Sequence, residues 1–249
     1  MHRSHHNEST ESGSHLLVFA GAGVSAESGL GTFRGPGGLW EEFRPEELAT
    51  PEAFARDPGR VWRWYAERFS RMREALPNAA HLEIARWQGL FASVVVVTQN
   101  IDRLHQRAGS RDVLELHGDL WTARCNRCRR EIDMPSAIDL VPGGGPPKCA
   151  CGGLLRPGVV WFGESLPELV FARAVAEARR AEILVAVGTS ATVYPAAGLI
   201  ELAAANGAQV IEVNREPTPL SRLAHRVLRE PAGEALPRLT AELLAYGAE

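Results

Sequence analysis

The chain has 249 residues, 45% hydrophobic and 23% charged, a composition typical of a globular protein and long enough for one large domain or a domain with insertions. The formal net charge of −3 and the absence of a membrane-length apolar run predict neither nucleic-acid nor membrane partners. Residues 1–15 are polar and lack the apolar core of a secretory signal, so we expect a disordered tail on a cytoplasmic, monomeric protein.

Apolar runs and helical patterns alternate along most of the chain. Short apolar runs at 16–20, 93–98, 183–187 and 209–213 predict strands that are covered on both faces. Helical spacing follows in segments that include 166–180 and 196–205. The alternation predicts an α/β fold, a Rossmann-like parallel sheet with helices on both faces.

Two stretches interrupt this alternation. Residues 41–90 are helix-like and rich in Trp, Phe and Arg, and residues 119–156 contain all four cysteines. We interpret them as a helical module and a zinc-binding module that pack together as a smaller lobe. The large domain then comprises residues 16–40, 91–118 and 157–249.

A glycine turn follows the first predicted strand directly. Gly21, Ala22, Gly23 and the residues to Ala26 fit the G-x-G-x-x-G/A pattern, in which glycines let the backbone approach a pyrophosphate. A tight turn that binds nothing is the alternative interpretation. Glu41 and Glu42 have the spacing of the acidic residue of dehydrogenases but do not follow a strand, so the pattern favours a dinucleotide site without simple hydride transfer.

The four cysteines form two close pairs, Cys125 with Cys128 and Cys149 with Cys151. Two such pairs are typical of tetrahedral thiolate coordination of one structural zinc ion. The second pair is one residue shorter than the usual C-x-x-C. Buried free thiols and a redox-active dithiol are the alternatives.

Polar residues follow two other predicted strands. Gln99, Asn100 and Asp102 stand at the carboxyl end of the 93–98 run, where open α/β sheets bind ligands; capping of a helix is the alternative role. His117 follows the strand-like run 113–116 on the side where the other motifs converge, and this position makes it a candidate base; an ordinary hydrogen-bonded histidine is the alternative.

Taken together, these segments resemble the sirtuins, the NAD-dependent protein lysine deacylases. The matching motifs occur in the family's order: GAGVSAESGLGTFRG (21–35), TQNIDRLHQRAG (98–109), LHG (116–118), the four cysteines, RPGVVWFGE (156–164), VGTSATVYPA (187–196) and EVNRE (212–216). Leu30-Gly31 stands where the family often has Ile-Pro. The resemblance implies a Rossmann-type domain, a small lobe with one structural zinc, and NAD and an acyl-lysine protein substrate that enter the cleft between the lobes.

The resemblance also implies a role for each matching residue. His117 and Asn100 would be catalytic, Phe33 would cover the reacting ribose carbon, and Asn100 and Asp102 would hold the ribose side and the nicotinamide carboxamide. The remaining NAD contacts would come from Gly21, Ala22, Gly23, Glu27, Thr32, Arg34, Trp40, Gln99, Ile101, Gly188, Thr189, Ser190, Asn214, Arg215, Glu216 and Ala232. The peptide and acyl-lysine tunnel would be lined by Val160, Phe162, Gly163 and Glu164.

The reaction implied by the resemblance yields free lysine, nicotinamide and an O-acyl-ADP-ribose. The acyl oxygen attacks the ribose carbon as nicotinamide leaves, in a cleft that must exclude water. His117 then takes a proton from the ribose diol. A protein ADP-ribosyltransferase and a non-catalytic NAD-binding regulator are the rival functions; the presence of His117 and Asn100 argues against the second.

The stretch Trp62–Arg68, WRWYAER, places Tyr65 and Arg68 on one helix face. From the apolar stripe alone, burial of the Tyr65 ring is the favoured interpretation, with Arg68 as a solvated flank. By resemblance, the sirtuin class with AESG after the glycine turn carries Tyr-x-x-Arg here, and both residues would bind a carboxylate on the acyl group. We therefore expect removal of succinyl or malonyl groups as well as acetyl.

Overall fold

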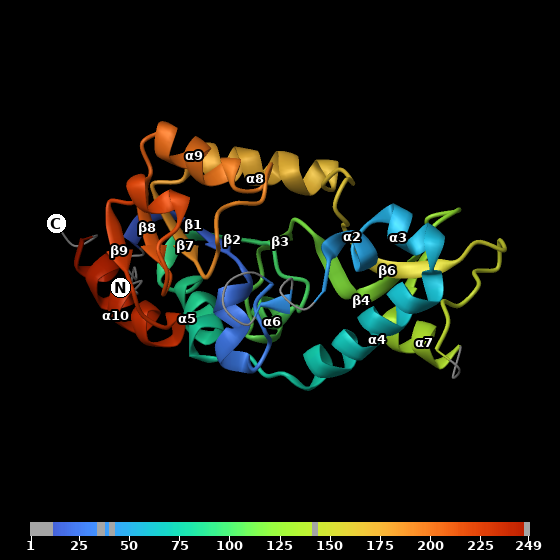
Figure 1. The fold of residues 1–249 in the computed structure, drawn as a ribbon. Helices are drawn as coiled ribbons and strands as arrows, with labels where there is room; N and C mark the ends of the chain where they lie inside the picture. The colour runs from blue at the N-terminus through green and yellow to red at the C-terminus, as the bar shows by residue number, and fades with distance from the viewer. Residues whose placement is uncertain (1–11, 34–37, 40–42, 141–143, 247–249) are drawn as a thin grey trace, which may run out of the picture.

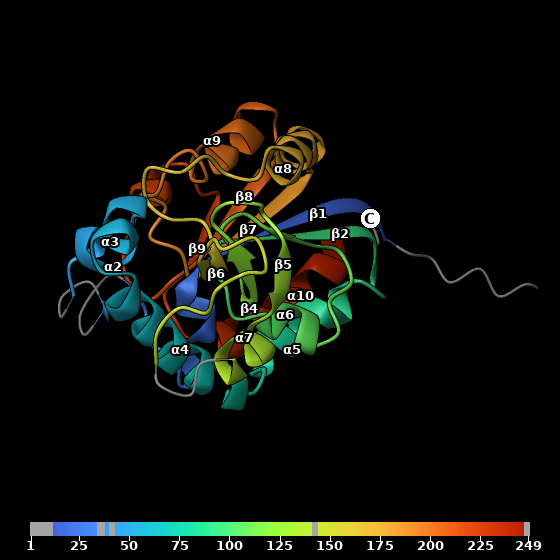
Figure 2. The ribbon, with the colours of Figure 1, turned by 90° about the vertical axis from the view of Figure 1, so that its right-hand side faces the viewer.

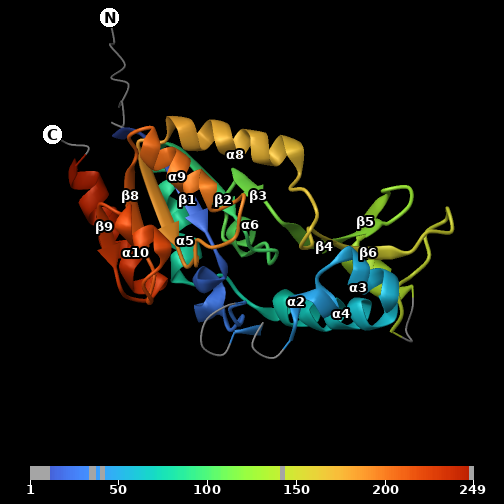
Figure 3. The same cartoon turned by 45° about the horizontal axis from the view of Figure 1, so that its top comes forward.

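The computed structural model describes residues 12–33, 38–39, 43–140 and 144–246, and it has a larger and a smaller lobe (Figure 1). Both ends of the described chain belong to the larger lobe, and the smaller lobe is built from segments between them (Figure 3). Within the described residues, no helix combines the length and the apolar character that crossing a membrane would require.

A six-stranded parallel sheet forms the larger lobe, in the order β3-β2-β1-β7-β8-β9. Its strands are β1 (Ser12–Ala20), β2 (Phe91–Thr98), β3 (Val113–Glu115), β7 (Ile183–Val187), β8 (Gln209–Val213) and β9 (Arg226–Leu228). The chain runs outward from β1 through β2 to β3, and later from β7 through β8 to β9. The strand order therefore reverses between β1 and β7, and ligands of open parallel sheets bind beside such a point.

Helices cover both faces of this sheet, as expected from the sequence. Its helical elements are η1 (Ala22–Ser28), α5 (Ala79–Trp87), α6 (Leu104–Arg107), α8 (Glu168–Arg180), α9 (Gly198–Ala205), η2 (Pro219–Arg222) and α10 (Ala232–Tyr246). Figure 2 shows α8 and α9 on one face of the sheet and α5 and α10 on the other. Alternate residues of β1 serve the two faces: Leu16 and Val18 pack with α5 and α10, while Leu17 and Phe19 pack with α8 and α9. This period of two explains why residues 16–20 of the strand are all apolar.

The smaller lobe has its own core between helices and a three-stranded antiparallel sheet of order β5-β4-β6. Its elements are α2 (Pro45–Leu48), α3 (Pro51–Arg56), α4 (Pro58–Glu74), β4 (Gly118–Cys125), β5 (Glu131–Asp133), α7 (Met134–Asp139) and β6 (Leu155–Val159). The α4 helix begins at Asp57, whose carboxylate accepts from the Arg60 N–H at 2.9 Å. The predicted fold class, a Rossmann-like sheet with a smaller two-part lobe, is confirmed.

The packing divides the chain at different residues from those that composition indicated. Residues 12–15, expected in the tail, begin β1 and extend it alongside β2. Residues 79–87, expected in the helical module, form α5, which packs on the large sheet through Ala80, Ile84 and Trp87. Residues 157–159, expected in the large domain, belong to the smaller lobe. Together with residues 155 and 156 they form β6, which pairs with β4. Local composition does not reveal which distant surface an amphipathic segment covers.

Candidate active site

The turn after β1 interlocks with the turn after β7 at the reversal of strand order. The Gly23 N–H donates to the Gly188 carbonyl at 2.8 Å, and the Gly21 N–H donates to Val187 at 3.0 Å. A Cβ on Gly21 would lie 2.7 Å from the Gly188 oxygen, and a Cβ on Gly188, whose φ is +60°, would lie 2.2 Å from the Val24 nitrogen. Only glycine fits this contact, which keeps backbone exposed toward the cavity beside it.

A cavity of about 730 Å³ lies beside this turn, and residues of both lobes line it. It brings together most of the residues that the sequence predicted. The predicted residues on its lining are Gly21, Ala22, Gly23, Glu27, Thr32, Phe33, Tyr65, Gln99, Asn100, Ile101, His117, Val160, Phe162, Gly163, Glu164, Gly188, Thr189, Ser190, Asn214, Arg215, Glu216 and Ala232. A volume of this size suits one extended small molecule rather than a single ion.

Two of the predicted NAD and substrate residues that the structure describes do not line this cavity. Arg68 and Asp102 line a smaller adjoining cavity, which shares Phe33 and Asn100 with the larger one. Arg34 and Trp40 lie outside the residues that the structure describes.

The ends of β2 and β8 are tied to the loop after β7 by amide side chains. The Gln99 amide donates to the Thr189 hydroxyl at 2.9 Å, and the Asn214 amide donates to the Thr189 carbonyl at 2.7 Å. Glu27, on η1, accepts from the Gly233 N–H of α10 at 2.9 Å. These bonds fix the walls of the cavity on either side of the glycine turn.

Asn100 is only 4% exposed and its amide nitrogen is fully used inside the protein. The amide donates to the Gly21 carbonyl at 3.1 Å and to the Ser25 hydroxyl at 3.2 Å. Among the described residues, no donor reaches its amide oxygen. Asn100 therefore presents an oriented acceptor where the two cavities meet.

His117 stands where the chain passes from β3 of the large sheet to β4 of the small one. Its Nδ1 lies 3.1 Å from the Gln99 carbonyl oxygen, which can only accept, so Nδ1 carries the proton and donates. Its Nε2 is then a lone-pair acceptor, and among the described residues it has no partner. Burial lowers the pKa of His117 below its ordinary value, so this base is neutral near pH 7.

A buried polar network behind Asn100 was not predicted from the sequence. The Ser25 hydroxyl donates to Asp102 at 2.7 Å and lies 3.4 Å from Nε2 of His81. His81 and Asn78 form a capping box at the start of α5. Burial raises the pKa of Asp102, although it accepts from the Leu104 N–H at 2.9 Å. In the sequence, residues 77–81 (PNAAH) indicate only the start of a helix. Their place beside the glycine turn becomes visible only in the folded structure.

His105 packs against this network without hydrogen bonds. Its ring lies 4.9 Å from that of His81, it is 1% exposed, and neither of its nitrogens has a partner among the described residues. Burial lowers the pKa of His81 to about 4 and that of His105 to about 3. Both rings are therefore neutral at physiological pH.

Tyr65 and Arg68 project from α4 toward the two cavities. Tyr65 is 4% exposed, and its hydroxyl accepts from the Trp161 indole N–H at 3.1 Å. The Arg68 guanidinium lies 5.0 Å from the Phe33 ring and 4.8 Å from the Trp64 ring, and its Nε is buried without a partner. No carboxylate among the described residues pairs with Arg68. Burial lowers the pKa of Arg68 to about 10, so it stays charged at neutral pH.

The segment that carries Val160 and Phe162 is held from both sides. The Val160 N–H donates to the His117 carbonyl at 2.8 Å, and the Phe162 N–H donates to the Ala49 carbonyl at 2.9 Å. Glu164, at its end, accepts two bonds from the Arg156 guanidinium, at 2.6 and 2.7 Å. Arg156 outweighs the opposing effect of burial and holds the pKa of Glu164 below its ordinary value, so this pair is ionised.

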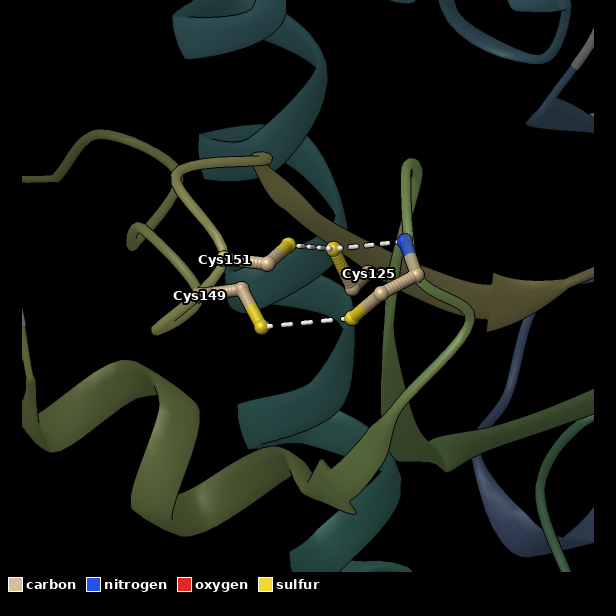
Figure 4. Close-up of side chains that lie close together, drawn as sticks. Cys125, Cys149 and Cys151 are labelled. Atoms are coloured by element: carbon tan, nitrogen blue, oxygen red, sulfur yellow. Dashed lines mark hydrogen bonds between the residues drawn. The ribbon is translucent and has the colours of Figure 1, made fainter.

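The four cysteines come together in the smaller lobe, and their sulfurs lie within 4.8 Å of one another. Figure 4 shows Cys125, Cys149 and Cys151 of this cluster with their side chains pointing toward one another. The Cys125 and Cys151 sulfurs are 3.5 Å apart, and those of Cys128 and Cys149 are 3.6 Å apart. A tetrahedral zinc ion with Zn–S bonds of about 2.3 Å separates its sulfurs by about 3.8 Å.

The surroundings of Cys125 also suit a metal-bound thiolate. The N–H groups of Cys128 and Arg127 point at its sulfur, at 3.5 and 3.4 Å, and these bonds lower its pKa to about 6. All four positions of a tetrahedral ion are filled by sulfur, so the residues fit one structural zinc and leave no site for a substrate. The short Cys149–Cys151 spacing is no obstacle to this geometry.

Comparison with known proteins places this arrangement in a family. Residues 21–195 match the model of the Sir2 family, and the chain belongs to that family. It is 51% identical over 230 residues to the NAD-dependent protein deacylase 2 of Pyrobaculum aerophilum, covering 92% of this chain and 91% of that protein.

Solved structures agree with this assignment. A Sir2 homologue in complex with NAD superposes with a TM-score of 0.84 and 44% identity, covering 99% of this chain and 98% of that one. A Sir2–p53 peptide–NAD⁺ structure has a TM-score of 0.82 at 33% identity, covering 92% of both chains. The sirtuin resemblance inferred from the motifs is confirmed.

Proposed function

We propose that this protein is an NAD-dependent protein lysine deacylase that accepts acyl groups with a terminal carboxylate. One observation carries the deacylase assignment: His117, whose Nε2 has no partner among the described residues, lines the cavity that Asn100 and the glycine turns also line. Relatives named NAD-dependent protein deacylase, about 50% identical over nearly the whole chain, support it. The products are free lysine, nicotinamide and an O-acyl-ADP-ribose.

The residues at the carboxyl ends of the strands fit NAD. Gly21 and Gly188 line the cavity and have no side chain to keep a pyrophosphate from their backbone, and Thr189 and Asn214 provide polar groups for the ribose beyond it. When bound, NAD supplies an electrophilic ribose carbon once nicotinamide leaves. Asn100 offers its amide oxygen at that end, and the apolar ring of Phe33 excludes water.

His117 acts as general base through Nε2. The Gln99 carbonyl fixes the Nδ1 proton, so the tautomer is set before substrate binds. Nε2 takes the proton from a ribose hydroxyl, and the resulting imidazolium keeps its hydrogen bond to Gln99. Arg156 and Glu164 anchor the segment along which the acyl-lysine peptide lies, so that the peptide and His117 share one rigid connection.

Arg68 and Tyr65 recognise the acyl carboxylate. A mostly buried guanidinium that has no carboxylate partner among the described residues has lost solvation without gaining an ion pair. A succinyl or malonyl carboxylate supplies that partner, and the Tyr65 hydroxyl adds a second donor. Acetyl-lysine offers no charge to either group. Arg68 lines the smaller cavity, and its guanidinium lies 5.0 Å from the Phe33 ring, which lines both cavities, so an acyl chain would have to pass that ring to reach Arg68.

A panel of acetyl-, succinyl- and malonyl-peptides with NAD tests both parts of the proposal. Mass spectrometry should detect O-acyl-ADP-ribose; a mass-shifted protein instead would identify an ADP-ribosyltransferase. In Arg68→Met, the ratio of kcat/KM for succinyl- to acetyl-peptide should fall about ten- to a hundredfold, the value of charge-assisted hydrogen bonds. Arg71→Met, on the same helix but exposed, is the matched control. An unchanged ratio in Arg68→Met refutes the acidic-acyl assignment.

A further inference from the structure

Tyr65 reaches the cavity with one of its hydrogen-bonding positions already occupied. The indole N–H of Trp161 donates to the Tyr65 hydroxyl oxygen at 3.1 Å, across 96 residues of sequence. Trp161 is 3% exposed and Tyr65 is 4% exposed, so water does not compete for this bond. The planes of the two rings are inclined by 39°, with centroids 6.4 Å apart.

Trp161 itself is held on several sides. Its backbone N–H donates to Glu164 at 2.9 Å, and the Arg156 guanidinium lies 3.4 Å from the centre of its ring. The Phe54 ring packs beside it at 5.4 Å. Because Arg156 and Glu164 are joined by two hydrogen bonds, the indole N–H has a fixed direction.

This bond determines what the Tyr65 hydroxyl can do. An indole N–H only donates, so the phenol oxygen must accept, and the phenol hydrogen is turned away from Trp161. Among the described residues, no acceptor takes that hydrogen. Burial raises the pKa of Tyr65 to about 12, so the hydroxyl remains protonated at physiological pH. A bound group that meets Tyr65 in the cavity therefore meets a donor.

We infer that Trp161 is a positioning residue for acyl-group selectivity, which directs the Tyr65 hydroxyl to donate to the carboxylate of an acidic acyl group. The inference rests on the proposed acidic-acyl activity. Donation from Trp161 to the phenol oxygen also polarises the O–H bond and strengthens it as a donor. The selectivity of this site then depends on an indole N–H that is already bonded to the Tyr65 hydroxyl.

A double-mutant cycle tests this connection. Trp161→Phe keeps a ring against Arg156 and Phe54 and removes only the N–H and part of the ring. We expect it to lower the ratio of kcat/KM for succinyl- to acetyl-peptide about two- to tenfold, the value of an ordinary hydrogen bond. In a Tyr65→Phe background the same change should leave the ratio where Tyr65→Phe alone puts it. Trp121→Phe, which removes an indole that packs on Phe69 of the same helix, is the matched control.

The outcomes test the role of Trp161 separately from the proposed acidic-acyl activity. A wild-type enzyme without measurable desuccinylation refutes the acidic-acyl proposal and the inference together. In an enzyme that does remove succinyl, the inference alone is refuted if Trp161→Phe leaves the ratio unchanged, or lowers it equally with and without the Tyr65 hydroxyl. An equal loss on both acyl groups assigns Trp161 to support of the peptide-binding segment instead.

A spectroscopic measurement needs no substrate. The paired ring bands of tyrosine in a Raman spectrum change in relative intensity when the phenol oxygen loses a donor. The Tyr65 contribution is isolated as the difference between the protein and Tyr65→Phe. That contribution should change in Trp161→Phe and stay the same in Trp121→Phe; an unchanged band pair in Trp161→Phe overturns the inference.

Discussion

Nδ1 of His117 lies 3.1 Å from the carbonyl oxygen of Gln99, and this contact leaves Nε2 as the only position on the ring that can accept a proton. The histidine is therefore committed to one tautomer before any substrate arrives. Replacing it removes the base and leaves the glycine turns and the walls of the cavity in place.

We expect His117→Ala to fold and bind NAD while turnover falls about 10²- to 10⁴-fold, the usual contribution of general base catalysis. Steady-state kinetics on an acyl-peptide measures the loss, and calorimetry with NAD alone measures the retained binding. A loss of less than about tenfold would contradict the assigned role.

The same residue predicts the acid side of the pH profile. Burial lowers the pKa of His117, and the neutral form is the active base, so activity persists below the ordinary histidine pKa of about 6.5. The acid limb of kcat/KM, which reports the free enzyme, should have its midpoint below that value. A midpoint at or above about 6.5 would show that the limiting group is not a buried His117.

The cysteine cluster predicts a metal content and a response to its removal. The purified protein should contain one zinc ion per chain, and chelation should lower Tm and unfold the smaller lobe, because Cys125 is part of the core that includes Tyr65 and Leu155. Elemental analysis and calorimetry measure the two effects, and addition of zinc should restore Tm. Fully active protein without zinc would refute the structural role.

The buried pair His81 and His105 predicts a dependence of stability on pH. Their folded pKa values, about 4 and about 3, lie below the unfolded value of about 6.5, so the unfolded state binds more protons between those limits. The free energy of unfolding should therefore fall as pH drops below about 6.5, by about 1.4 kcal/mol per pH unit for each histidine.

His105→Leu isolates one of these contributions. Neither ring nitrogen of His105 has a partner among the described residues, so an apolar replacement leaves no hydrogen bond broken. Urea unfolding at pH 7 should change little, while the dependence between pH 6 and pH 5 should weaken by about 1.4 kcal/mol per unit. An unaltered dependence would mean that His105 is not buried in its neutral form.

The sequence predicts the central strands of the large sheet well, because strands that are covered on both faces are mostly apolar. The run 183–187 coincides with β7 and the run 209–213 with β8. The zinc ligands are predicted equally well, because two close pairs of cysteines are typical of a zinc site. The resemblance then assigns the site residues that a single strand end does not identify.

Contacts between residues that lie far apart in the sequence could not be predicted in this way. Nothing near Tyr65 in the sequence indicates Trp161, and nothing near Ser25 indicates His81. Arg68, expected from its helix alone to flank a solvated face, is mostly enclosed, because Phe33 from another segment covers its guanidinium. Helix periodicity gives the direction of a side chain and not the surface that it meets.

The position of His117 has a consequence for motion. It precedes Gly118 of β4, which pairs with Val159, and its carbonyl accepts from Val160, so it lies at the joint where one lobe passes into the other. Points on such a joint move least when two rigid bodies rotate about it. Any rotation of the lobes about this joint would leave the base nearly still, and the Trp161–Tyr65 bond ties α4 to the segment beside it. The candidate proton acceptor is thus placed where backbone hydrogen bonds join the two lobes.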